Sequence, residues 1–436
     1  MHMDVPGVTA ESLEDWLRYL ESLHPSVIEM GLERVANVRS ELGLIPQFPV
    51  ITVGGTNGKG SVCAMLEAIL QSAGYKTGCY TSPHLIRFNE RFRIDGQDIE
   101  NASLCQAFAQ VEAARRNCHA SLTFFEFGTL AAMYLFVQAR VDVAVLEIGL
   151  GGRLDAVNIF DPDCAILTSI DLDHIEYLGD TREKIGFEKA AIFRHGKPAI
   201  CADTDVPDSV YQHATRIGAQ LSRFSKEFGF QSKDKQWDFW GPKGWRYSLP
   251  VPALRGSKQL QNASACLAAL DAIHELLPVN MNTIRQGLIK ATVPGRFQVV
   301  STQPMIILDV AHNPAAAAVL AQNLAATPCA GRTYAVFSML QDKDIQGVVQ
   351  KLKDEIDVWL LFPIQSLRAA TVEYIEQEIR NAGFPGGDLP IYRFSDGVEA
   401  YAFACEQASK NDRICIFGSF YTVGDVLSHL HMPSRA

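Results

Sequence analysis

The fold of this chain is decided by the stretch Val50-Ile51-Thr52-Val53-Gly54-Gly55-Thr56-Asn57-Gly58-Lys59-Gly60-Ser61. An apolar run passes here through a glycine-rich turn into a helix, and such a turn lets backbone N–H groups converge on phosphate oxygens. Lys59 adds a full positive charge, and Ser61 or Thr56 can serve Mg²⁺ or phosphate. The pattern is not a Walker A motif, because Gly60 separates Lys59 from Ser61. We expect a phosphate-binding loop; the alternative is an ordinary glycine turn before a helix.

The residues after this loop have the spacing of a helix with one apolar face. Apolar side chains three and four positions apart fall on the same side of a helix. Gly74 stands where a left-handed glycine would end that helix. The loop is therefore predicted to be mounted on a rigid amphipathic helix, whose apolar face consists of Val62, Met65, Leu66, Ile69 and Leu70.

The length and composition are those of a globular protein with more than one domain. The chain has 436 residues, of which 47% are apolar and 20% are charged, and a single hydrophobic core seldom organises so many residues. The formal net charge of −10 disfavours a nucleic-acid binder that relies on broad attraction to phosphates. A local basic site for a small anion such as ATP is compatible with that charge.

The cysteines and the amino-terminal residues indicate a cytoplasmic protein. The ten cysteines are scattered, form no Cys-x-x-Cys pair and in several cases lie inside apolar runs, as reduced and buried thiols do. Residues 1–40 contain no secretory signal, and no apolar run reaches the roughly 20 residues that cross a bilayer. No membrane association is expected.

Short β-branched runs alternate with helical patterns in the first two-thirds of the chain. Alternation of this kind predicts a parallel sheet covered by helices. The segment 224–257 changes character, since it is rich in Trp, Lys, Gly and Pro, and we interpret it as a small β-rich excursion. The buried strands are predicted at 50–53, 143–148, 165–170 and 198–201.

The Pro-Gly pair in Val293-Pro294-Gly295 interrupts the helical pattern, as a hinge or linker does. Beyond it, a second series of strands at 305–310, 333–339, 357–362 and 413–417 alternates with helices. We therefore predict an α/β protein of two domains. Residues 1–294 form a P-loop-type parallel-sheet domain flanked by helices, and residues 295–436 form a smaller Rossmann-like α/β domain.

Polar side chains follow three of the β-like runs, at the sheet edge where α/β proteins bind ligands. Glu147 ends one strand and can hold Mg²⁺ through its carboxylate; the alternative is a buried acid paired with a basic group. His174 follows the next strand and can ligate a divalent ion or orient a phosphate, although a lone histidine is more often structural. Ser82, after the run 78–80, is either a third ligand or part of a plain turn.

Together with the phosphate loop, six short motifs occur in the order found in bacterial folylpolyglutamate synthase/dihydrofolate synthase, a branch of the Mur ligase superfamily of ATP-dependent amide ligases. The sequence resembles this family over residues 54–314, and the ordered set is far more specific than any single motif. The motifs are T-S-P-H-L from Thr81, E-I-G-L-G-G-R-L-D-A-V-N from Glu147, S-I-D-L-D-H from Ser169, G-F-E-K-A-A-I-F from Gly186, P-G-R-F from Pro294 and D-V-A-H-N-P from Asp309.

The resemblance implies a metal site and a modified lysine. Ser82, Glu147 and His174 would bind Mg²⁺, and Lys189 would carry a carboxylate on its amine. A carbamate converts the cation into an anionic oxygen donor, which can hold a second Mg²⁺ beside the transferring phosphate. Read alone, Lys189 would be a solvated helix residue. Lys59, Lys189 and His174 are accordingly the predicted catalytic residues.

The resemblance also implies how ATP and the amino acid are bound. Asn262, Arg296 and Asp309 would contact ATP, and His312 would help to bind the amino acid. Without the resemblance, the first three are a helix-cap asparagine, a surface arginine and a turn acid. The predicted ATP-binding set is Thr56, Asn57, Gly58, Lys59, Gly60, Ser61, Asn262, Arg296 and Asp309.

A pterin-containing substrate is expected where aromatic surface can pack against a flat heterocycle and a carboxylate can accept hydrogen bonds from its ring. For Phe124 and Phe125, burial in a core is the alternative. The predicted substrate residues are Leu154, Asp155, Ala156, Thr123, Phe124, Phe125 and Glu126, with Ile28, Glu29, Met30 and Gly31 completing the pocket.

The reaction implied by the resemblance is the ATP-dependent addition of L-glutamate to dihydropteroate and to reduced folates through an acyl phosphate, with two Mg²⁺ ions as cofactor. Two alternatives stay open: a Mur-type ligase acting on a nucleotide-sugar peptide, and a P-loop regulatory NTPase that needs no acceptor. The expected partners are these small molecules, with no nucleic acid and no membrane. The resemblance implies a monomer.

Overall fold

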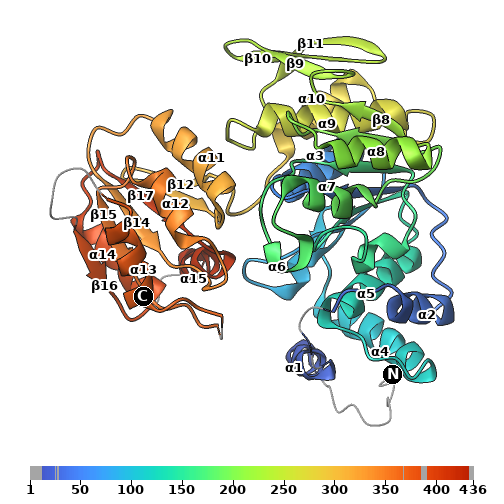
Figure 1. The fold of residues 1–436 in the computed structure, drawn as a ribbon, viewed down its shortest axis with the longest axis horizontal. Coiled ribbons are helices and arrows are strands. Elements are labelled where there is room, and N and C mark those ends of the chain that lie inside the picture. The colour runs from blue at the N-terminus through green and yellow to red at the C-terminus, as the bar shows by residue number, and fades with distance from the viewer. Residues whose placement is uncertain (1–11, 25, 27–28, 367, 384–389, 432–436) are drawn as a thin grey trace. The chain divides into compact units, whose positions relative to one another are not determined.

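The computed structural model describes residues 12–24, 26, 29–366, 368–383 and 390–431, which divide into two compact units (Figure 1). Unit 1 contains the described residues up to Pro83 together with Asn89–Ala253 and Leu260–Thr292. Unit 2 contains His84–Phe88, Leu254–Gln259 and the described residues from Val293 onward. The division at residue 295 into two domains stays a prediction, because compact packing does not show that a part folds alone.

The core of unit 1 is an eight-stranded sheet. Six adjacent strands run parallel, and an antiparallel pair closes one edge. Parallel strands are covered on both faces, so they read as continuous apolar runs, and β1, β5 and β6 are buried at every position. In sheet order the strands are β4 (Gln97–Asp98), β3 (Phe92–Ile94), β2 (Thr77–Tyr80), β5 (Val143–Glu147), β1 (Val50–Gly54), β6 (Cys164–Leu167), β7 (Pro198–Cys201) and β8 (Gln220–Arg223).

Helices supply the crossovers between these strands. Each parallel connection needs a long crossover, and a helix provides it while covering a face of the sheet. The helices that lie in unit 1 or enter it are α1 (Leu13–Leu23), α2 (Glu33–Glu41), α3 (Lys59–Ser72), α4 (Asn101–Asn117), α5 (Phe124–Ala139), α6 (Ile175–Leu178), α7 (Arg182–Ala190), α8 (Asp208–Ile217), α9 (Gln259–Ala272) and α10 (Met281–Lys290), with short 3-10 helices η1 (Phe88–Arg91) and η2 (Ala156–Ile159).

Helix α3, which follows the phosphate loop, is buried on more than one face. It packs against β1, β2 and β5 on the sheet side and against α10 on the other, and residues 62–66 are all buried. The prediction of an amphipathic helix is therefore wrong here: the apolar positions are buried as expected, but α10 also covers the positions between them. The helix ends at Ser72, and Gly74, just beyond the cap residue Ala73, has the predicted left-handed conformation with a φ of 90°.

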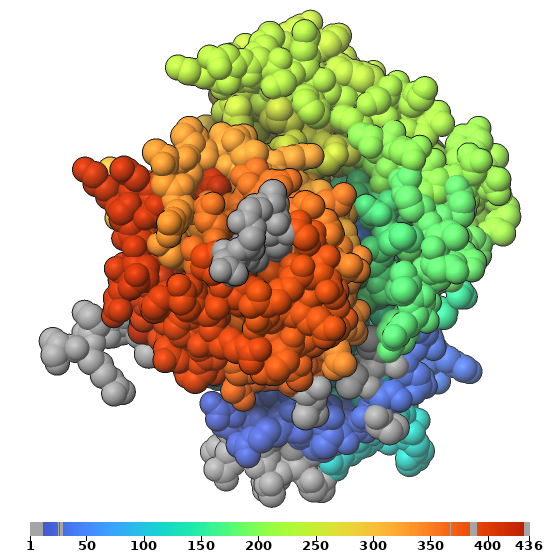
Figure 2. All heavy atoms as spheres, turned by 60° about the vertical axis from the view of Figure 1, so that its left-hand side comes forward, coloured from blue at the N-terminus to red at the C-terminus, as the bar shows by residue number. Residues whose placement is uncertain are grey.

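The β-rich excursion predicted at 224–257 is confirmed as a three-stranded antiparallel sheet of β9 (Gly229–Ser232), β10 (Gln236–Gly241) and β11 (Gly244–Pro250). Trp237 and Phe239 are fully buried in it. Trp245 and Tyr247 are exposed and stack with their ring centroids 5.8 Å apart. In Figure 2 this sheet is the yellow-green projection at the top of its unit.

Unit 2 is built on a six-stranded sheet in which β12 alone is antiparallel. In sheet order the strands are β12 (Gln298–Thr302), β13 (Met305–Asp309), β17 (Arg413–Phe417), β14 (Thr333–Phe337), β15 (Val358–Leu361) and β16 (Ile391–Arg393). The helices are α11 (Pro314–Ala325), α12 (Ile345–Leu352), α13 (Val372–Asn381), α14 (Gly397–Gln407) and α15 (Phe420–His431). This unit is coloured orange and red in Figures 1 and 2.

Two separate apolar layers cover the sheet of unit 2. One layer joins α11, α12 and α13 to the strands through residues such as Leu320, Val348 and Ile375. The other joins α14 and α15 to the opposite face through residues such as Ala404 and Val426. Helices on both faces of a mostly parallel sheet form a doubly wound architecture, and the predicted α/β class is confirmed.

The strands that the sequence reading missed lie mainly at sheet edges: β3, β4, β8, β12 and β16. Strands β4, β8 and β12 have no position that is fully buried, so they lack the continuous apolar runs that identified the central strands. Among the described residues, no helix is long and apolar enough to span a membrane.

The contact between α3 and α10 offers a test of the packing in unit 1. A Cβ placed on Gly287 of α10 would lie 2.6 Å from both the backbone N and Cγ1 of Ile69. We expect Gly287→Ala to lower stability by about 1–3 kcal/mol or more, because backbone cannot yield as a flexible side chain does. Gln286→Ala, at an exposed position of the same helix, is the control. Equal urea midpoints for the two variants would contradict this packing.

Candidate active site

The order of strands brings the predicted site residues to one edge of the sheet. Strands β2, β5, β1 and β6 are consecutive neighbours and run parallel, so their carboxyl ends meet at the same edge. Ser82 follows β2, Glu147 ends β5, the phosphate loop follows β1 and His174 follows β6. The loop thus emerges between the strands that carry the predicted metal ligands.

Glycine is required at two positions of the phosphate loop. Gly55 has a φ of 139°, and a Cβ there would collide with the hydroxyl of Thr168. Gly58 has a φ of 92° and stands at the amino terminus of α3, where a Cβ would lie 3.0 Å from Oδ1 of Asn262. Asn262, predicted to contact ATP, is thus placed by α9 directly against the phosphate loop.

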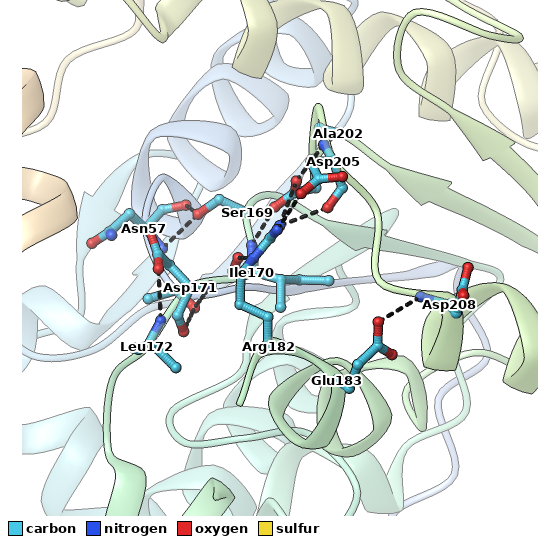
Figure 3. Close-up of polar contacts among 12 residues, drawn as sticks. Asn57, Ser169, Ile170, Asp171, Leu172, Arg182, Glu183, Ala202, Asp205 and Asp208 are labelled. Atoms are coloured by element: carbon cyan, nitrogen blue, oxygen red, sulfur yellow. Dashed lines mark hydrogen bonds and ion pairs between the residues drawn. The ribbon is translucent and has the colours of Figure 1, made fainter. Parts of the chain in front are cut away.

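The end of β6 holds the phosphate loop in place through backbone and hydroxyl contacts (Figure 3). The N–H of Thr56 donates to the carbonyl of Ser169 at 2.6 Å, and the N–H of Asn57 donates to Ser169 Oγ at 3.0 Å. Thr168 Oγ1 donates to the carbonyl of Asn57 at 2.7 Å. Thr56 Oγ1 both accepts from Asp171 N and donates to Asp171 O. These contacts occupy the amides of Thr56 and Asn57, so phosphate contacts are expected from the following residues.

Sequence reasoning did not identify Thr168 and Ser169 as loop supports. Their position at the carboxyl end of the predicted strand 165–170 was the available signal, because polar residues at the carboxyl ends of parallel strands lie at the ligand edge. What the sequence could not supply was the pairing of β6 with β1, which spans more than a hundred positions of the chain.

Lys59 and Lys189 converge on one carbonyl group. The Nζ atoms of both side chains donate to the oxygen of Gly55, each at 3.1 Å. Lys189 is 4% exposed, so the alternative of a solvated helix lysine does not describe it. Burial lowers the pKa of Lys189 to about 7, with Lys59 lowering it further and Asp173 and Asp155 acting in the opposite direction.

Glu147 lies against the phosphate loop and the Ser82 segment. Its Oε2 accepts a hydrogen bond from the backbone N–H of Ser82 at 3.1 Å and lies 4.0 Å from where a Cβ on Gly60 would stand. Among the described residues, no three His, Cys, Asp or Glu side chains form a ready-made metal cage. Mg²⁺ is commonly held by one or two carboxylates with phosphate oxygens and water. A buried carboxylate beside a phosphate loop fits that kind of site.

His174 opens the short helix α6 in the left-handed conformation, with a φ of 50°. Its ring Nε2 is 3.9 Å from Oδ1 of Asp173, and its backbone N–H donates to the same atom at 2.9 Å. Asp173 in turn influences the charge state of Lys189. The role of His174 as a metal ligand or a phosphate contact stays a prediction.

The predicted pterin residues assemble around the loop 149–156. A Cβ on Gly149 would lie 2.6 Å from the ring of Phe125, and one on Gly151 would lie 3.8 Å from Cε of Met30. Phe124 and Phe125 are half-buried in the first turn of α5, so neither is a core residue. Arg91 stands 5.9 Å from the centre of the Phe124 ring. Of the predicted set, Ile28 lies outside the described residues.

Glu126, predicted to bind the substrate, has both carboxylate oxygens bonded within the protein. Glu126 is 3% exposed; its Oε2 accepts from Thr123 N at 2.7 Å and its Oε1 pairs with Arg34 at 3.0 Å. Arg34 also pairs with Glu29, so Glu126 holds the Glu29 segment against α5. No local sequence pattern points to Arg34, since its contact with Glu126 joins residues 92 positions apart.

Asp155 is buried at the start of η2. Its two carboxylate oxygens accept hydrogen bonds from Leu150 N at 2.7 Å and from Val157 N at 2.9 Å. Burial raises its pKa to about 6, although these hydrogen bonds and Lys59 act in the opposite direction. Each carboxylate oxygen has a second lone pair, so the carboxylate can still accept a hydrogen bond from a ligand. Ala156 is buried and Leu154 is half-buried beside it.

Unit 2 carries a separate group of predicted residues at the carboxyl ends of β13 and β17. Asp309 accepts hydrogen bonds from Phe297 N and Ala311 N, both at 2.8 Å. Phe420 lies between Arg296, 5.6 Å from its ring centre, and His312, whose ring centre is 5.9 Å away. The roles predicted for Arg296, Asp309 and His312 in binding ATP and the amino acid stay predictions.

Comparison with known proteins agrees with this arrangement. The model of the Mur ligase middle domain matches residues 53–270, and that of the Mur ligase glutamate ligase domain matches residues 295–420. The dihydrofolate synthase/folylpolyglutamate synthase of Escherichia coli is 44% identical over 419 residues, which cover 96% of this chain and 95% of that protein. The chain belongs to the dihydrofolate synthase/folylpolyglutamate synthase family. The resemblance drawn from the sequence motifs is therefore confirmed.

Solved structures of dihydrofolate synthase/folylpolyglutamate synthases share the fold over nearly their whole length. E. coli FolC in complex with DHPP and ADP has a TM-score of 0.91 and 43% identity, over 98% of this chain and 99% of that one. A bifunctional folylpolyglutamate synthase/dihydrofolate synthase with Mn, AMPPNP and L-glutamate bound has a TM-score of 0.89 and 44% identity, over 98% and 100%.

The environment of Lys189 predicts that it forms a carbamate with CO₂. Only the neutral amine reacts, and a pKa of about 7 leaves far more neutral amine near neutral pH than an ordinary lysine with a pKa of about 10.4. The fraction of neutral amine rises as pH increases through the lowered pKa. Carbon NMR with ¹³C-bicarbonate should therefore give a carbamate signal that is strong at about pH 8 and weak at about pH 6.

The same spectra provide the control. Lys189→Met should abolish the signal, whereas Lys184→Met, at an exposed position of the same helix, should retain it. A signal of equal strength in wild type and Lys189→Met would assign the carbamate to another amine.

Proposed function

We propose that this chain is an ATP-dependent ligase that joins the amino group of L-glutamate to the carboxylate of dihydropteroate, forming dihydrofolate, and to the carboxylates of reduced folates. The observation that carries the proposal is the convergence of Lys59 and Lys189 on the carbonyl of Gly55, inside the phosphate loop. Glu147 adjoins the same loop, and a half-buried aromatic surface at Phe125 lies against Gly149.

Amide formation in water requires activation of the acid. A carboxylate is a poor electrophile, and its oxygen is a poor leaving group. Transfer of the γ-phosphoryl group of ATP to the substrate carboxylate gives an acyl phosphate and ADP, and phosphate then becomes the leaving group. Lys59 and the amides at the start of α3 stabilise negative charge on the moving phosphoryl group, so catalysis comes mainly from electrostatics and positioning.

The metal ions belong to this step. Mg²⁺, when bound, neutralises charge on the phosphate oxygens. Glu147, Ser82 and His174 are the residues that would hold one ion, and Lys189 in its carbamate form would hold a second. Burial, and after it repulsion between the neighbouring ammonium groups of Lys59 and Lys189, lowers the pKa of Lys189, which supports this role. Conversion of one of them to an anion removes the repulsion.

The amino group of glutamate then attacks the acyl phosphate. The tetrahedral intermediate collapses to an amide and releases inorganic phosphate. His312, at the end of β13 in unit 2, is proposed to help bind the amino acid, and Arg296 and Asp309 of the same unit are proposed to contact ATP. Arg296 and His312 both lie against the ring of Phe420, which supports a shared binding role for these two residues.

The pterin end of the acceptor is proposed to bind beside the loop 149–156. The rings of Phe124 and Phe125 offer flat apolar surface, and Asp155 offers a carboxylate oxygen to ring N–H groups. Met30 lies near Gly151 and can close one side. Glu126 is proposed to support this pocket through Arg34, which also pairs with Glu29. Small molecules are thus the proposed partners, and a monomeric state, cytoplasmic location and absence of nucleic-acid binding stay predictions.

The direct test is product mass analysis. Wild type incubated with ATP, Mg²⁺ and glutamate should convert dihydropteroate and tetrahydrofolate to products that contain one more glutamate. Lys59→Met should reduce the rate of amide formation by about two to three orders of magnitude, because a charge that acts on the transferring phosphoryl group is lost. Lys76→Met, at a site that contacts Ala139 and Asp142, is the control for loss of a lysine.

Two results would contradict the proposal. One is phosphate release from ATP by wild type that is independent of both glutamate and acceptor, which would indicate a regulatory NTPase. The other is normal amide formation by Lys59→Met.

The raised pKa of Asp155 predicts a pH dependence of acceptor binding. Protonation removes the negative charge that attracts ring N–H groups, so the KM for dihydropteroate should rise as pH falls through about 6, the pKa of this residue. Asp155→Asn should raise KM by about tenfold at neutral pH, as loss of a charged hydrogen bond does, and should flatten this pH profile. The KM for ATP should stay unchanged. A pH profile that is identical in the variant would exclude Asp155 as its source.

A further inference from the structure

Arg182, the first residue of α7, donates hydrogen bonds from all three guanidinium nitrogens to backbone and carboxylate oxygens near the phosphate loop. Its Nε donates to the carbonyl of Ile170 at 2.8 Å. Its Nη2 donates to Asp203 Oδ1 at 3.1 Å and to the carbonyl of Asp205 at 2.6 Å, and its Nη1 donates to Asp205 Oδ2 at 2.6 Å. The planar guanidinium thereby links α7 to the ends of two parallel strands, β6 and β7 (Figure 3).

Asp203 binds the backbone N–H of Ile170, the same residue whose carbonyl Arg182 binds. Its Oδ2 accepts the N–H of Ile170 at 2.6 Å, while Oδ1 accepts from Arg182 and from the N–H of Asp205 at 2.8 Å. The N–H and the carbonyl of Ile170 are therefore both held by the same ion pair. Asp203 is 6% exposed, and a buried pair that also satisfies backbone groups fixes geometry more firmly than a surface pair does.

Ile170 stands between the two residues that hold the phosphate loop. Ser169 accepts from the backbone N–H groups of Thr56 and Asn57, and Asp171 exchanges hydrogen bonds with the hydroxyl of Thr56. A displacement of Ile170 would therefore move both supports together. The guanidinium is therefore connected to the loop by hydrogen bonds on either side of the covalent backbone 169–171, and each of these hydrogen bonds is shorter than 3.2 Å.

The other end of α7 carries Lys189. Lys189 follows Arg182 by seven positions, about two helical turns, so an anchor at the first residue of the helix helps to set where the lysine stands. Lys189 Nζ contacts Gly55, which opens the same phosphate loop. The loop and the lysine that faces it are thus positioned by one contact.

We propose that Arg182, paired with Asp203, is a positioning residue for nucleotide binding, which fixes the phosphate loop through Ile170. It does not touch the nucleotide and takes no part in proton or phosphoryl transfer. This inference rests on the proposed function in taking an adenine nucleotide as the ligand of the loop.

The experiment measures the Kd of ADP by calorimetry alongside the unfolding temperature. We expect Arg182→Met and Asp203→Asn each to weaken ADP binding by about tenfold, and the double variant to be no weaker than the worse single one, as for two residues in one network. Arg182→Lys should not restore binding, because an ammonium cannot reach Ile170 and both aspartates in a planar fork. The KM for glutamate should stay within about twofold of wild type.

Two control variants separate positioning from general stability. Glu183→Gln changes the next residue of α7, whose carboxylate accepts from Asp208 N at 3.0 Å and Ser209 N at 2.8 Å and so holds α8 (Figure 3). Asp205→Asn keeps the backbone contact to Arg182, and its amide oxygen can still accept from Nη1, so that only the exposed charge of the Asp205 side chain is lost. Both should leave the Kd of ADP near the wild-type value even if they lower the unfolding temperature.

The outcomes distinguish this inference from the function on which it rests. Unchanged ADP affinity in Arg182→Met would overturn the positioning role while leaving the ligase assignment intact. An equal loss of affinity in Glu183→Gln at an equal loss of stability would also overturn it, because helix destabilisation alone would then explain the effect. A wild-type protein that binds no ADP would overturn the proposed function itself.

Discussion

The parallel pairing of β1 with β5 on one side and β6 on the other is the constraint on which the rest of unit 1 depends. It sets three strand ends side by side, so that the phosphate loop lies between a carboxylate at the end of β5 and the hydroxyl-bearing end of β6. The loop can approach Thr168 this closely only because residue 55 is glycine. The contact of Lys59 with Gly55 and the position of Asn262 against Gly58 both depend on this placement of the loop.

The resulting site brings two lysine side chains together, of which Lys189 is buried. Two ammonium groups share the carbonyl of Gly55, which is unfavourable unless anions join them or one amine loses its charge. The carboxylates of Asp155 and Asp173 act in the compensating direction, as a bound triphosphate or a carbamate on Lys189 would. The electrostatics of the site are therefore those of a protein built to hold a polyanion, as expected for an ATP-dependent ligase.

Much of the fold could be predicted from the sequence because parallel strands are buried on both faces and appear as uninterrupted apolar runs. The central strands of both sheets were identified in this way, as was the β-rich excursion. The edge strands, such as β8 and β12, could not be, because solvent on one side permits polar residues. The amphipathic reading of α3 failed for a related reason, since a helix covered by both a sheet and α10 has no polar face to display.

By itself the sequence determined the phosphate loop, the α/β class and the family, because glycine placement, apolar runs and ordered motifs are local features that survive without knowledge of contacts. Only the tertiary structure decided which carboxylates are committed to the protein, as Glu126 is to Arg34, and which residues hold the loop, as Thr168 and Ser169 do. Those contacts join positions up to more than a hundred residues apart, and strand pairing and helix packing, which no short pattern encodes, bring them together.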